Sequence, residues 1–341
     1  MKKIKIKFLL IYFLVFFLNN QAFSSKISNK QILELSDTQL TLFSNHFRNV
    51  CNSSKFYENL NKIFKHKFGK PTEWKKKCLI LEKNESAKDF KKFLINNFKF
   101  KKIQKKSGLL TGYYEPIIKV SRNRDNIYKF PILKKNNFYT KKPRSFIEKN
   151  FREKDVILWT NDEINLFFLH IQGSGIGELS NKKKVRLVYN GNNEMSYKSI
   201  GKILIKKNYI NKKNVNLFTI KKWLRANPLL SKEILHHNKR FIFFKKMPFG
   251  IDKHPVGAFG TPLAANFSVA VDKNIYPLGL PFFIEMQKNE SILPVISLDT
   301  GGAIIGPNRA DLFFGRGEVA EKKAGVLKKK IYLHAFIPYS N

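Results

Sequence analysis

Two aspartates near the C-terminus have the sequence setting of groups that do acid–base chemistry. Asp299 ends the apolar run 292–298 and precedes a pair of glycines, and Asp311 follows twelve residues later, two positions after Arg309. Carboxyl groups beside apolar strands lose hydration, which raises their pKa values. A carboxylic acid that stays protonated can act as the general acid that cleavage of a glycosidic bond requires. A sugar-cleaving enzyme is one interpretation of this pattern and turn capping by each aspartate is the other, and the pattern alone leaves both open.

A third aspartate and two glycine-containing segments offer further contacts for a sugar. Asp272 follows the apolar run 267–271, and sugar binding and turn capping are equally good interpretations of it. Segment 111–116 reads Thr-Gly-Tyr-Tyr-Glu-Pro, and its tyrosines could stack on a sugar ring or simply face a core. Segment 170–175 reads His-Ile-Gln-Gly-Ser-Gly. Its amide and hydroxyl groups can hydrogen-bond a sugar, and its glycines let a ligand approach the backbone.

Several other chemistries are disfavoured. Ser174 is not in a GxSxG elbow because position 172 is glutamine, and the glycines beside it do not match the dinucleotide fingerprint. Cys51 and Cys78 do not have zinc-site spacing and the seven histidines are scattered, so we expect neither a metal nor a cofactor. A disulfide between the two cysteines suits an exported chain, but the sequence leaves their pairing open.

The N-terminus has the layout of a secretory signal peptide, which we assign to residues 1–24. Four lysines in the first seven residues precede the apolar run 8–18, and Ala22-Phe23-Ser24 gives a small-x-small cleavage pattern. The run is shorter than the roughly 18 residues that span a bilayer, although an uncleaved anchor is the alternative. No cysteine follows it closely, so a lipid anchor is not expected. These features predict an exported protein of the periplasm or cell envelope.

The net charge of +39, from 64 basic and 25 acidic residues, also needs an explanation. A basic surface can bind nucleic acid, anionic lipid or an acidic polymer. Here the basic residues are spread along the whole chain, together with abundant Asn, Ile and Phe, and no nucleic-acid-binding motif accompanies them. Biased composition accounts for this better than a binding footprint, and we expect no nucleic-acid partner. A glycan that carries carboxylates would tolerate such a surface.

The hydrophobic pattern changes character twice along the chain. Residues 27–100 read as helical, and Ser86 with Asp89 resembles a capping box. Residues 217–224 share a helical face, and Pro228 is expected to end that segment. Strands are predicted in short apolar runs between turn residues, at 110–120, 156–160, 164–172, 185–190, 267–271, 282–286, 292–298 and 331–336. This alternation hints at one domain inserted into another.

Six segments in this order and spacing resemble the membrane-bound lytic murein transglycosylase A family. The resemblance extends from about residue 108 to about residue 337, and the six segments are 111–116, 168–175, 197–202, 223–228, 260–283 and 298–315. The resemblance implies a mainly β protein with N-terminal helices and two domains. Residues 25–108 plus 245–341 would form a double-psi β-barrel domain, and residues 109–244 a second, inserted β-barrel domain, with a glycan groove at their junction.

The resemblance also implies a reaction: cleavage of the β-1,4 bond between N-acetylmuramic acid and N-acetylglucosamine, which leaves a 1,6-anhydro ring. By similarity Asp311 would be the single acid and base, and Asp299 would bind in the groove and raise the pKa of its neighbour. The other implied substrate contacts are Asp272, Thr111, Gly112, Tyr113, Tyr114, Glu115, Gln172, Gly173, Ser174, Gly175 and Arg309.

Two departures from the family pattern leave alternatives open. The founding members are lipoproteins, whereas this chain lacks the acceptor cysteine, and Glu115 stands where some relatives have threonine, which leaves its role undefined. The alternative functions are a hydrolase on the same scaffold, in which Asp299 positions water, and a non-catalytic glycan-binding protein. We expect a monomer that acts on peptidoglycan glycan strands, with other cell-wall enzymes as candidate partners.

Overall fold

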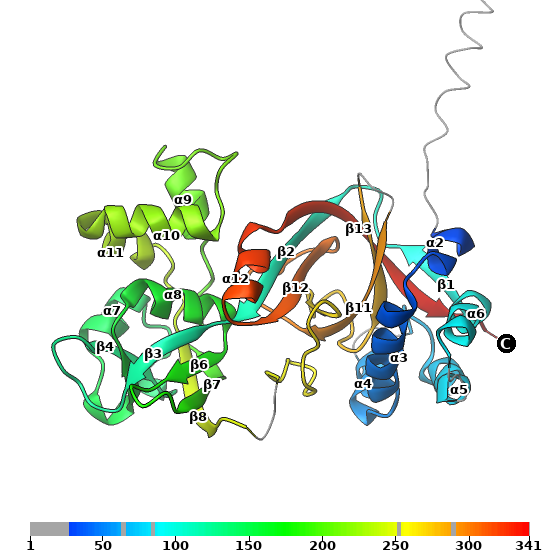
Figure 1. The fold of residues 1–341 in the computed structure, drawn as a ribbon, viewed down its shortest axis with the longest axis horizontal. Coiled ribbons are helices and arrows are strands. Elements are labelled where there is room, and N and C mark those ends of the chain that lie inside the picture. Colours follow the sequence, from blue (N-terminus) through cyan, green and yellow to red (C-terminus); the bar gives the residue numbers. More distant parts are fainter. Residues whose placement is uncertain (1–26, 63–65, 83–85, 251–253, 288–290, 341) are drawn as a thin grey trace, which may run out of the picture.

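The computed structural model describes residues 27–62, 66–82, 86–250, 254–287 and 291–340, and it contains two β-sheets with a group of helices at the N-terminus (Figure 1). The predicted signal peptide, residues 1–24, lies outside the described residues. Within the described ranges, no helix combines the length and hydropathy that crossing a membrane demands.

In the described residues, five helices precede the first strand. They are α2 (Asn29–Leu33), α3 (Asp37–Cys51), α4 (Ser54–Lys62), α5 (Pro71–Glu82) and α6 (Ala87–Asn97). The predicted start of α6 is confirmed, because the Ser86 hydroxyl accepts the Asp89 N–H at 3.1 Å. A disulfide joins Cys51 at the end of α3 to Cys78 in α5, which answers the pairing that the sequence left open.

The first sheet is a closed barrel with one additional strand. Its order is β1-β13-β10-β11-β9-β12-β2, and β2 also pairs with β13, so six strands form a ring that β1 extends. The pairs β2–β12 and β9–β11 are parallel and the others are antiparallel. The strands are β1 (Phe98–Lys102), β2 (Gly108–Glu115), β9 (Ser268–Ala270), β10 (Pro281–Met286), β11 (Ile292–Asp299), β12 (Arg309–Arg316) and β13 (Lys328–Pro338), and α12 (Gly317–Val326) connects the last two.

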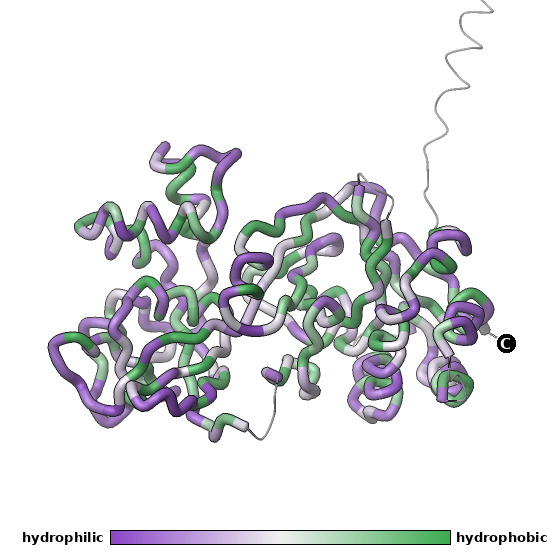
Figure 2. The backbone as a smooth tube through the Cα atoms, viewed as in Figure 1, coloured by the Kyte–Doolittle hydropathy of each residue, from purple (hydrophilic) through white to green (hydrophobic). Residues whose placement is uncertain are grey.

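The barrel and the N-terminal helices share one apolar core. Phe43 and Phe47 of α3 lie with Phe336 of β13 in a cluster of aromatic rings, and Trp74 of α5 packs edge-on to Phe47. Nearly every residue of β10 and β11 is buried, since one face points into the barrel and the other is covered. Hydrophobic residues accordingly follow these strands, while hydrophilic residues gather in outer loops (Figure 2).

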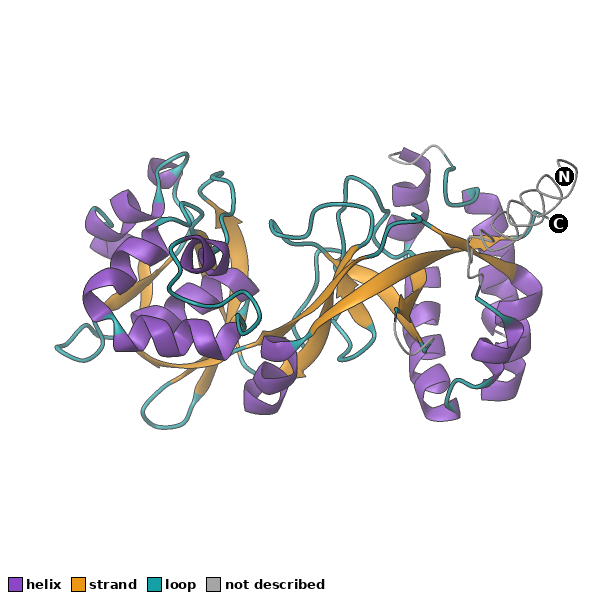
Figure 3. Ribbon diagram, turned by 90° about the horizontal axis from the view of Figure 1, so that it is seen from above, coloured by secondary structure: helices purple, strands orange, loops and turns teal. Residues whose placement is uncertain are grey.

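The second sheet has six strands and lies in the chain between β2 and β9. Its order is β4-β5-β3-β6-β7-β8. The sheet and its helices lie together on one side of the barrel (Figure 3). The strands are β3 (Ile117–Ser121), β4 (Phe130–Leu133), β5 (Val156–Thr160), β6 (Gly175–Glu178), β7 (Lys184–Asn192) and β8 (Ile242–Pro248). The helices are α7 (Arg144–Lys149), α8 (Glu163–Gln172), α9 (Ile200–Lys206), α10 (Leu217–Ala226) and α11 (Pro228–His236), with short 3₁₀ turns at Asn137–Tyr139 and Glu153–Asp155.

One predicted strand is wrong. Residues 164–172 form α8, whose N-cap Asp162 accepts the Asn165 N–H at 2.9 Å. The run is apolar without alternation because residues 166–170 are all buried, and such a run does not distinguish a buried strand from a buried helix. The strand predicted at 110–120 is interrupted at Pro116, where β2 of the barrel ends and β3 of the second sheet begins. Pro228 does separate two helices, since it is the first residue of α11.

A buried histidine makes the second sheet sensitive to acid. Neither ring nitrogen of His170 has a hydrogen-bond partner among the described residues, and its ring lies 4.3 Å from that of Phe241. Burial, and then the positive charge of Arg144, hold the pKa of His170 well below its usual range. Below about pH 6.5 the unfolded chain therefore binds a proton that the folded chain does not, and stability falls as the pH falls.

We expect His170→Leu to weaken this acid sensitivity. Between pH 6.5 and pH 5, the free energy of unfolding should fall more steeply for the wild type than for the variant. The two slopes should differ by up to about 1.4 kcal/mol per pH unit. Urea unfolding at several pH values measures this difference, and His254→Gln, at an exposed histidine, is the control. Parallel pH profiles for the wild type and His170→Leu would contradict the assignment.

Candidate active site

Asp311 lies on β12 directly beside Thr111 of the parallel strand β2. The Thr111 hydroxyl donates a hydrogen bond to Asp311 Oδ1, and Arg309 Nη2 donates to the Thr111 oxygen at 2.8 Å. Because the threonine oxygen accepts from the arginine, its own proton is directed at the carboxyl group. Three residues that the sequence singled out separately are thus brought together by one parallel strand pair.

Asp299 ends β11 and has three donors. Tyr113 Oη donates to Oδ2 at 3.0 Å, while the backbone N–H groups of Ala258 and Thr300 donate to Oδ1 at 3.0 and 2.9 Å. Three donors around one carboxyl group favour its ionised form, which only accepts hydrogen bonds. Asp311 has a single such donor among the described residues, so the two aspartates have different surroundings.

Both carboxyl groups are half-buried, and each has a raised pKa. Burial is the main cause for Asp311; the charge of Arg309 and the Thr111 hydrogen bond lower its pKa, and the charge of Asp299 raises it further. Burial also raises the pKa of Asp299, and its three hydrogen bonds offset part of that rise. The pair therefore has the electrostatics of an acid–base site, in which burial favours a proton on one of the carboxyl groups.

Asp272 holds two backbone segments together through its side chain. Its Oδ1 accepts the Asn274 N–H at 3.0 Å and its Oδ2 accepts the Gly306 N–H at 2.9 Å. Gly306 belongs to the segment that connects Asp299 to Asp311, so the contact helps to hold both aspartates in place. These bonds are those of the turn-capping interpretation, and Asp272 makes none to the aspartate pair among the described residues.

The remaining residues of segment 111–116 face two different surroundings. Tyr113 reaches Asp299, whereas Tyr114 is buried against Ala320 and Ala324 of α12. A Cβ atom at Gly112 would lie 2.7 Å from the Ala324 backbone, so glycine allows α12 to approach β2. The alternation of strand side chains thus divides this segment between the site and the packing of α12.

Glu115 is fully buried, away from the open part of the site. Its Oε1 lies 3.2 Å from Arg186 Nη1 of β7, and its Oε2 lies 2.5 Å from Arg316 Nε at the end of β12. One carboxylate therefore links the barrel to the second sheet. This ion-pair network is the role that the sequence left undefined.

Segment 172–175 lies beside β2. Gln172 Oε1 accepts the Tyr114 N–H at 3.0 Å, which brings the end of α8 to the strand that carries Thr111. Gly173 ends α8 with a φ of 83° and has open space where a side chain would be, and Ser174 next to it is partly exposed. Gly175, by contrast, is packed closely against Leu169. No cluster of three or more metal-ligating His, Cys, Asp or Glu side chains occurs in the described part of the chain.

Tyr197 is a site residue that we did not predict. It precedes α9, and burial is the main cause of its raised pKa, with the charge of Asp311 raising it further and that of Arg309 lowering it. Its hydroxyl therefore interacts electrostatically with Asp311 and Arg309. The sequence pointed to Tyr197 only as part of the segment 197–202 of the family resemblance. It gave no sign of the backbone donors at Ala258 and Thr300, since every non-proline residue has an N–H group.

Comparison with known proteins matches two parts of this chain to family models and the whole fold to solved structures. Residues 133–245 match the MltA specific insert domain and residues 267–336 match the 3D domain. A solved structure of membrane-bound lytic murein transglycosylase from Agrobacterium tumefaciens is 24% identical, with a TM-score of 0.75 over 89% of this chain and 93% of the other. Escherichia coli MltA with bound chitohexaose is 22% identical, with a TM-score of 0.70 over 89% and 91%. These likenesses confirm the predicted fold: a β-barrel with N-terminal helices and a second, inserted β structure.

Two sequence relatives carry the assignment further. Membrane-bound lytic murein transglycosylase A of Escherichia coli K12 is 26% identical over 295 residues, which are 82% of this chain and 76% of the relative. A homolog of that enzyme from Buchnera aphidicola subsp. Schizaphis graminum is 31% identical over 350 residues, covering 95% of this chain and 92% of the relative. With nearly the whole of both chains aligned at this identity, the protein belongs to the membrane-bound lytic murein transglycosylase A family.

Proposed function

We propose that this protein is a peptidoglycan lytic transglycosylase that cleaves the β-1,4 bond between N-acetylmuramic acid and N-acetylglucosamine and forms a 1,6-anhydromuramoyl product. The observation that carries the proposal is the inequality of the two aspartates. Asp299 is surrounded by three donors that favour its carboxylate, while Asp311 has one donor and a pKa raised by burial and by the neighbouring negative charge. Asp311 is therefore the group that carries the proton.

The reaction needs one acid and base because the nucleophile is part of the substrate. Protonated Asp311 donates its proton to the glycosidic oxygen as the bond from that oxygen to C1 breaks. The resulting carboxylate then takes the proton of the muramoyl C6 hydroxyl, whose oxygen bonds to C1 and closes the anhydro ring. The proton returns to Asp311, and no water is consumed.

The neighbours of Asp311 support both halves of this cycle. The negative charge of Asp299 raises the pKa of Asp311 and keeps the acid protonated before the substrate binds. After proton transfer, the Thr111 hydroxyl and the Arg309 charge stabilise the new carboxylate. Asp299 also places negative charge where positive charge develops on the sugar ring in the transition state.

The groups that bind the glycan complete the proposal. We assign direct contact to the open positions Gln172, Gly173 and Ser174 and to the residues around the aspartates, Thr111, Tyr113 and Arg309. Gly112, Tyr114, Glu115, Gly175 and Asp272 would act by packing and by fixing loops, as their contacts support. The chitohexaose bound to the Escherichia coli relative supports a glycan as ligand.

Product mass decides between this reaction and the alternatives. Digestion of purified sacculi is expected to release muropeptides with anhydro ends. Products heavier by one water would identify a hydrolase in which Asp299 positions the nucleophile. Binding to sacculi without release would identify a glycan-binding protein.

Location and domain limits belong to the same proposal. The layout of residues 1–24 and the membrane-bound relatives support a place in the cell envelope, and a cleaved signal peptide stays a prediction. Strand β2 belongs to the barrel sheet and β3 to the second sheet, which supports a barrel domain that runs to Glu115 and resumes after β8. The expected start of the inserted domain then moves from residue 109 to residue 117. A monomeric state and contacts with other cell-wall enzymes also stay predictions.

A further inference from the structure

A cavity of about 580 Å³ lies between the segment before α9 and the end of α11. Its lining includes Met195, Tyr197 and Lys198 on one side and His236, His237 and Lys239 on the other. Among its eight lining residues are two lysines and two histidines, and Glu233 is the one acidic residue of that lining. We call it the Lys198–Lys239 pocket.

The pocket adjoins the acid–base site through Arg240, which packs against the loop after Asp299, and through the charge interaction of Tyr197 with Asp311. Tyr197 lines it and also lies within electrostatic range of Asp311. On the other side, Arg240 donates from Nη1 to the carbonyl oxygen of Met195 at 3.2 Å, and a Cβ atom at Gly302 would lie 3.3 Å from the guanidinium carbon. Gly302 belongs to the segment that connects Asp299 to Asp311, so Arg240 links the pocket wall to that segment.

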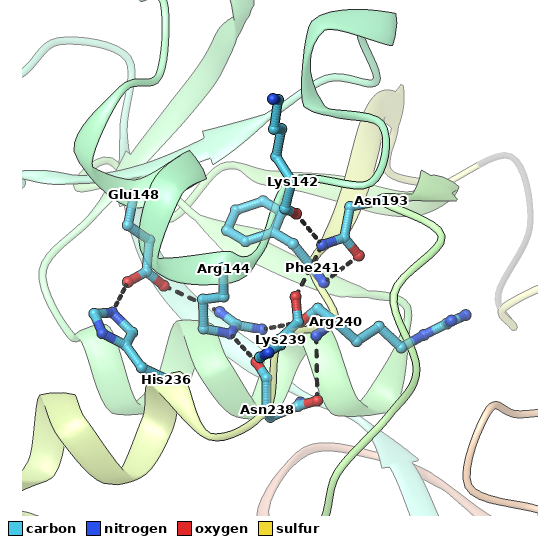
Figure 4. A network of polar contacts seen from close by, with 9 residues as sticks. All are labelled: Lys142, Arg144, Glu148, Asn193, His236, Asn238, Lys239, Arg240 and Phe241. Atoms are coloured by element: carbon cyan, nitrogen blue, oxygen red, sulfur yellow. Dashed lines mark hydrogen bonds and ion pairs between the residues drawn. The ribbon is translucent and has the colours of Figure 1, made fainter.

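A rigid frame holds the wall that carries Lys239. Arg144 is buried and donates to the carbonyl oxygens of Asn238 and Arg240 at 3.2 and 2.8 Å, and Asn193 donates to that of Lys239 at 2.8 Å (Figure 4). The Asn238 side chain in turn accepts the Lys198 N–H at 3.1 Å, which ties the two walls together. The pocket is thus preformed, as a binding site requires.

The two lysines of the pocket are open to a ligand. The acidic residue Glu233 is already paired with Lys207 at 3.0 Å, and His236 is paired with Glu148 at 2.8 Å. Lys198 and Lys239 are exposed and make no ion pair with any carboxylate among the described residues. Two lysines about one preformed cavity favour a ligand that carries carboxylate groups.

We propose that the Lys198–Lys239 pocket binds the carboxylates of the peptide attached to the muramoyl residue at the cleavage site. The proposal rests on the proposed function, which puts a muramoyl sugar beside Asp311, and it names the part of the substrate that the neighbouring pocket recognises. The enzyme would then select glycan strands that carry peptides over strands from which the peptides have been removed.

The test compares kcat/KM on intact glycan strands and on strands stripped of peptide by an amidase. Lys198→Gln/Lys239→Gln is expected to lower kcat/KM on intact strands about fivefold to tenfold, as loss of two exposed charge pairs implies, and on stripped strands less than twofold. The loss should shrink as salt is raised. Lys212→Gln/Lys213→Gln, with the same change of charge at exposed residues outside the pocket, is the control.

Equal losses on both substrates, or no loss on either, would overturn the pocket assignment. Calorimetric titration with a soluble disaccharide-peptide and with the peptide-free disaccharide gives a readout that is independent of catalysis. The wild type could make no anhydro product and still bind the disaccharide-peptide better than the peptide-free disaccharide. If the double variant lost that preference, the proposed function would be refuted and the pocket assignment would be retained. Equal affinity for both disaccharides would refute the pocket alone.

Discussion

Asp311→Asn is expected to lower the release of anhydromuropeptides from sacculi by at least about 10³-fold, because the variant loses the group that both donates and accepts the reacting proton. The amide has the shape of the carboxyl group and still accepts the Thr111 hydrogen bond, so binding to sacculi should be retained. Initial rates from mass-resolved products, together with a sacculus sedimentation assay, measure both quantities.

The melting temperature shows whether Asp311→Asn is inactive through loss of the proton or through loss of the fold. Asp311 has a raised pKa in the folded protein, so above the usual aspartate pKa the folded chain holds its proton more tightly than the unfolded chain does. Stability from this group therefore falls as the pH rises, and Asp311→Asn should leave the melting temperature at pH 7 unchanged or raise it. A variant that is inactive because it is unfolded would melt lower. Asp37→Asn, at an exposed aspartate of α3, is the matched control for activity.

The same raised pKa sets the pH dependence of the reaction. The acid must be protonated before the substrate binds, so kcat/KM should fall as the pH rises through the pKa of Asp311 in the free enzyme. A rate profile that is flat from acid to neutral pH would argue against a carboxylic acid as the donor. Retention of more than a tenth of wild-type activity by Asp311→Asn would have the same consequence.

Glu115→Ala is expected to destabilise the protein by about 3–5 kcal/mol, the usual effect of breaking a buried ion pair. The substitution removes the carboxylate that Arg186 and Arg316 share, and Arg186 is 5% exposed. Urea unfolding monitored by fluorescence measures the change in free energy. Since the carboxylate joins β2 and β12 to β7, activity should also fall at temperatures where the variant is still folded.

An exposed ion pair serves as the comparison for this effect. Glu153→Gln removes the surface pair with Arg124, in which both side chains are more than half exposed, and should cost no more than about 1 kcal/mol. Glu115→Gln keeps the size of the side chain and tests the charge alone. If both Glu115 variants unfolded at wild-type urea concentrations, the network would have no role in joining the two sheets.

Local sequence patterns were reliable where one physical signal dominated. Turn residues bounded the apolar runs that became β5, β7, β10 and β11, and Ser86 placed the start of α6 through its side-chain oxygen. Residues 164–172 had no such signal, since a run buried on all sides lacks the alternation that distinguishes a strand from a helix. The role of Glu115 was left undefined for a similar reason, because burial and ion pairing depend on which distant segments pack around a residue.

By itself the sequence determined which residues could do the chemistry and where they stand in the chain. Asp299 and Asp311 were identified from their flanking apolar runs and glycines, and the spacing of six segments indicated the family. The family resemblance gave the two aspartates different expected roles, and only the tertiary structure decided which groups surround each of them. The donors that separate them, Tyr113, Ala258 and Thr111, come from segments up to 200 residues away in the chain. A carboxyl group's proton affinity depends on the charges, donors and water around it in space, and those are set when the barrel closes.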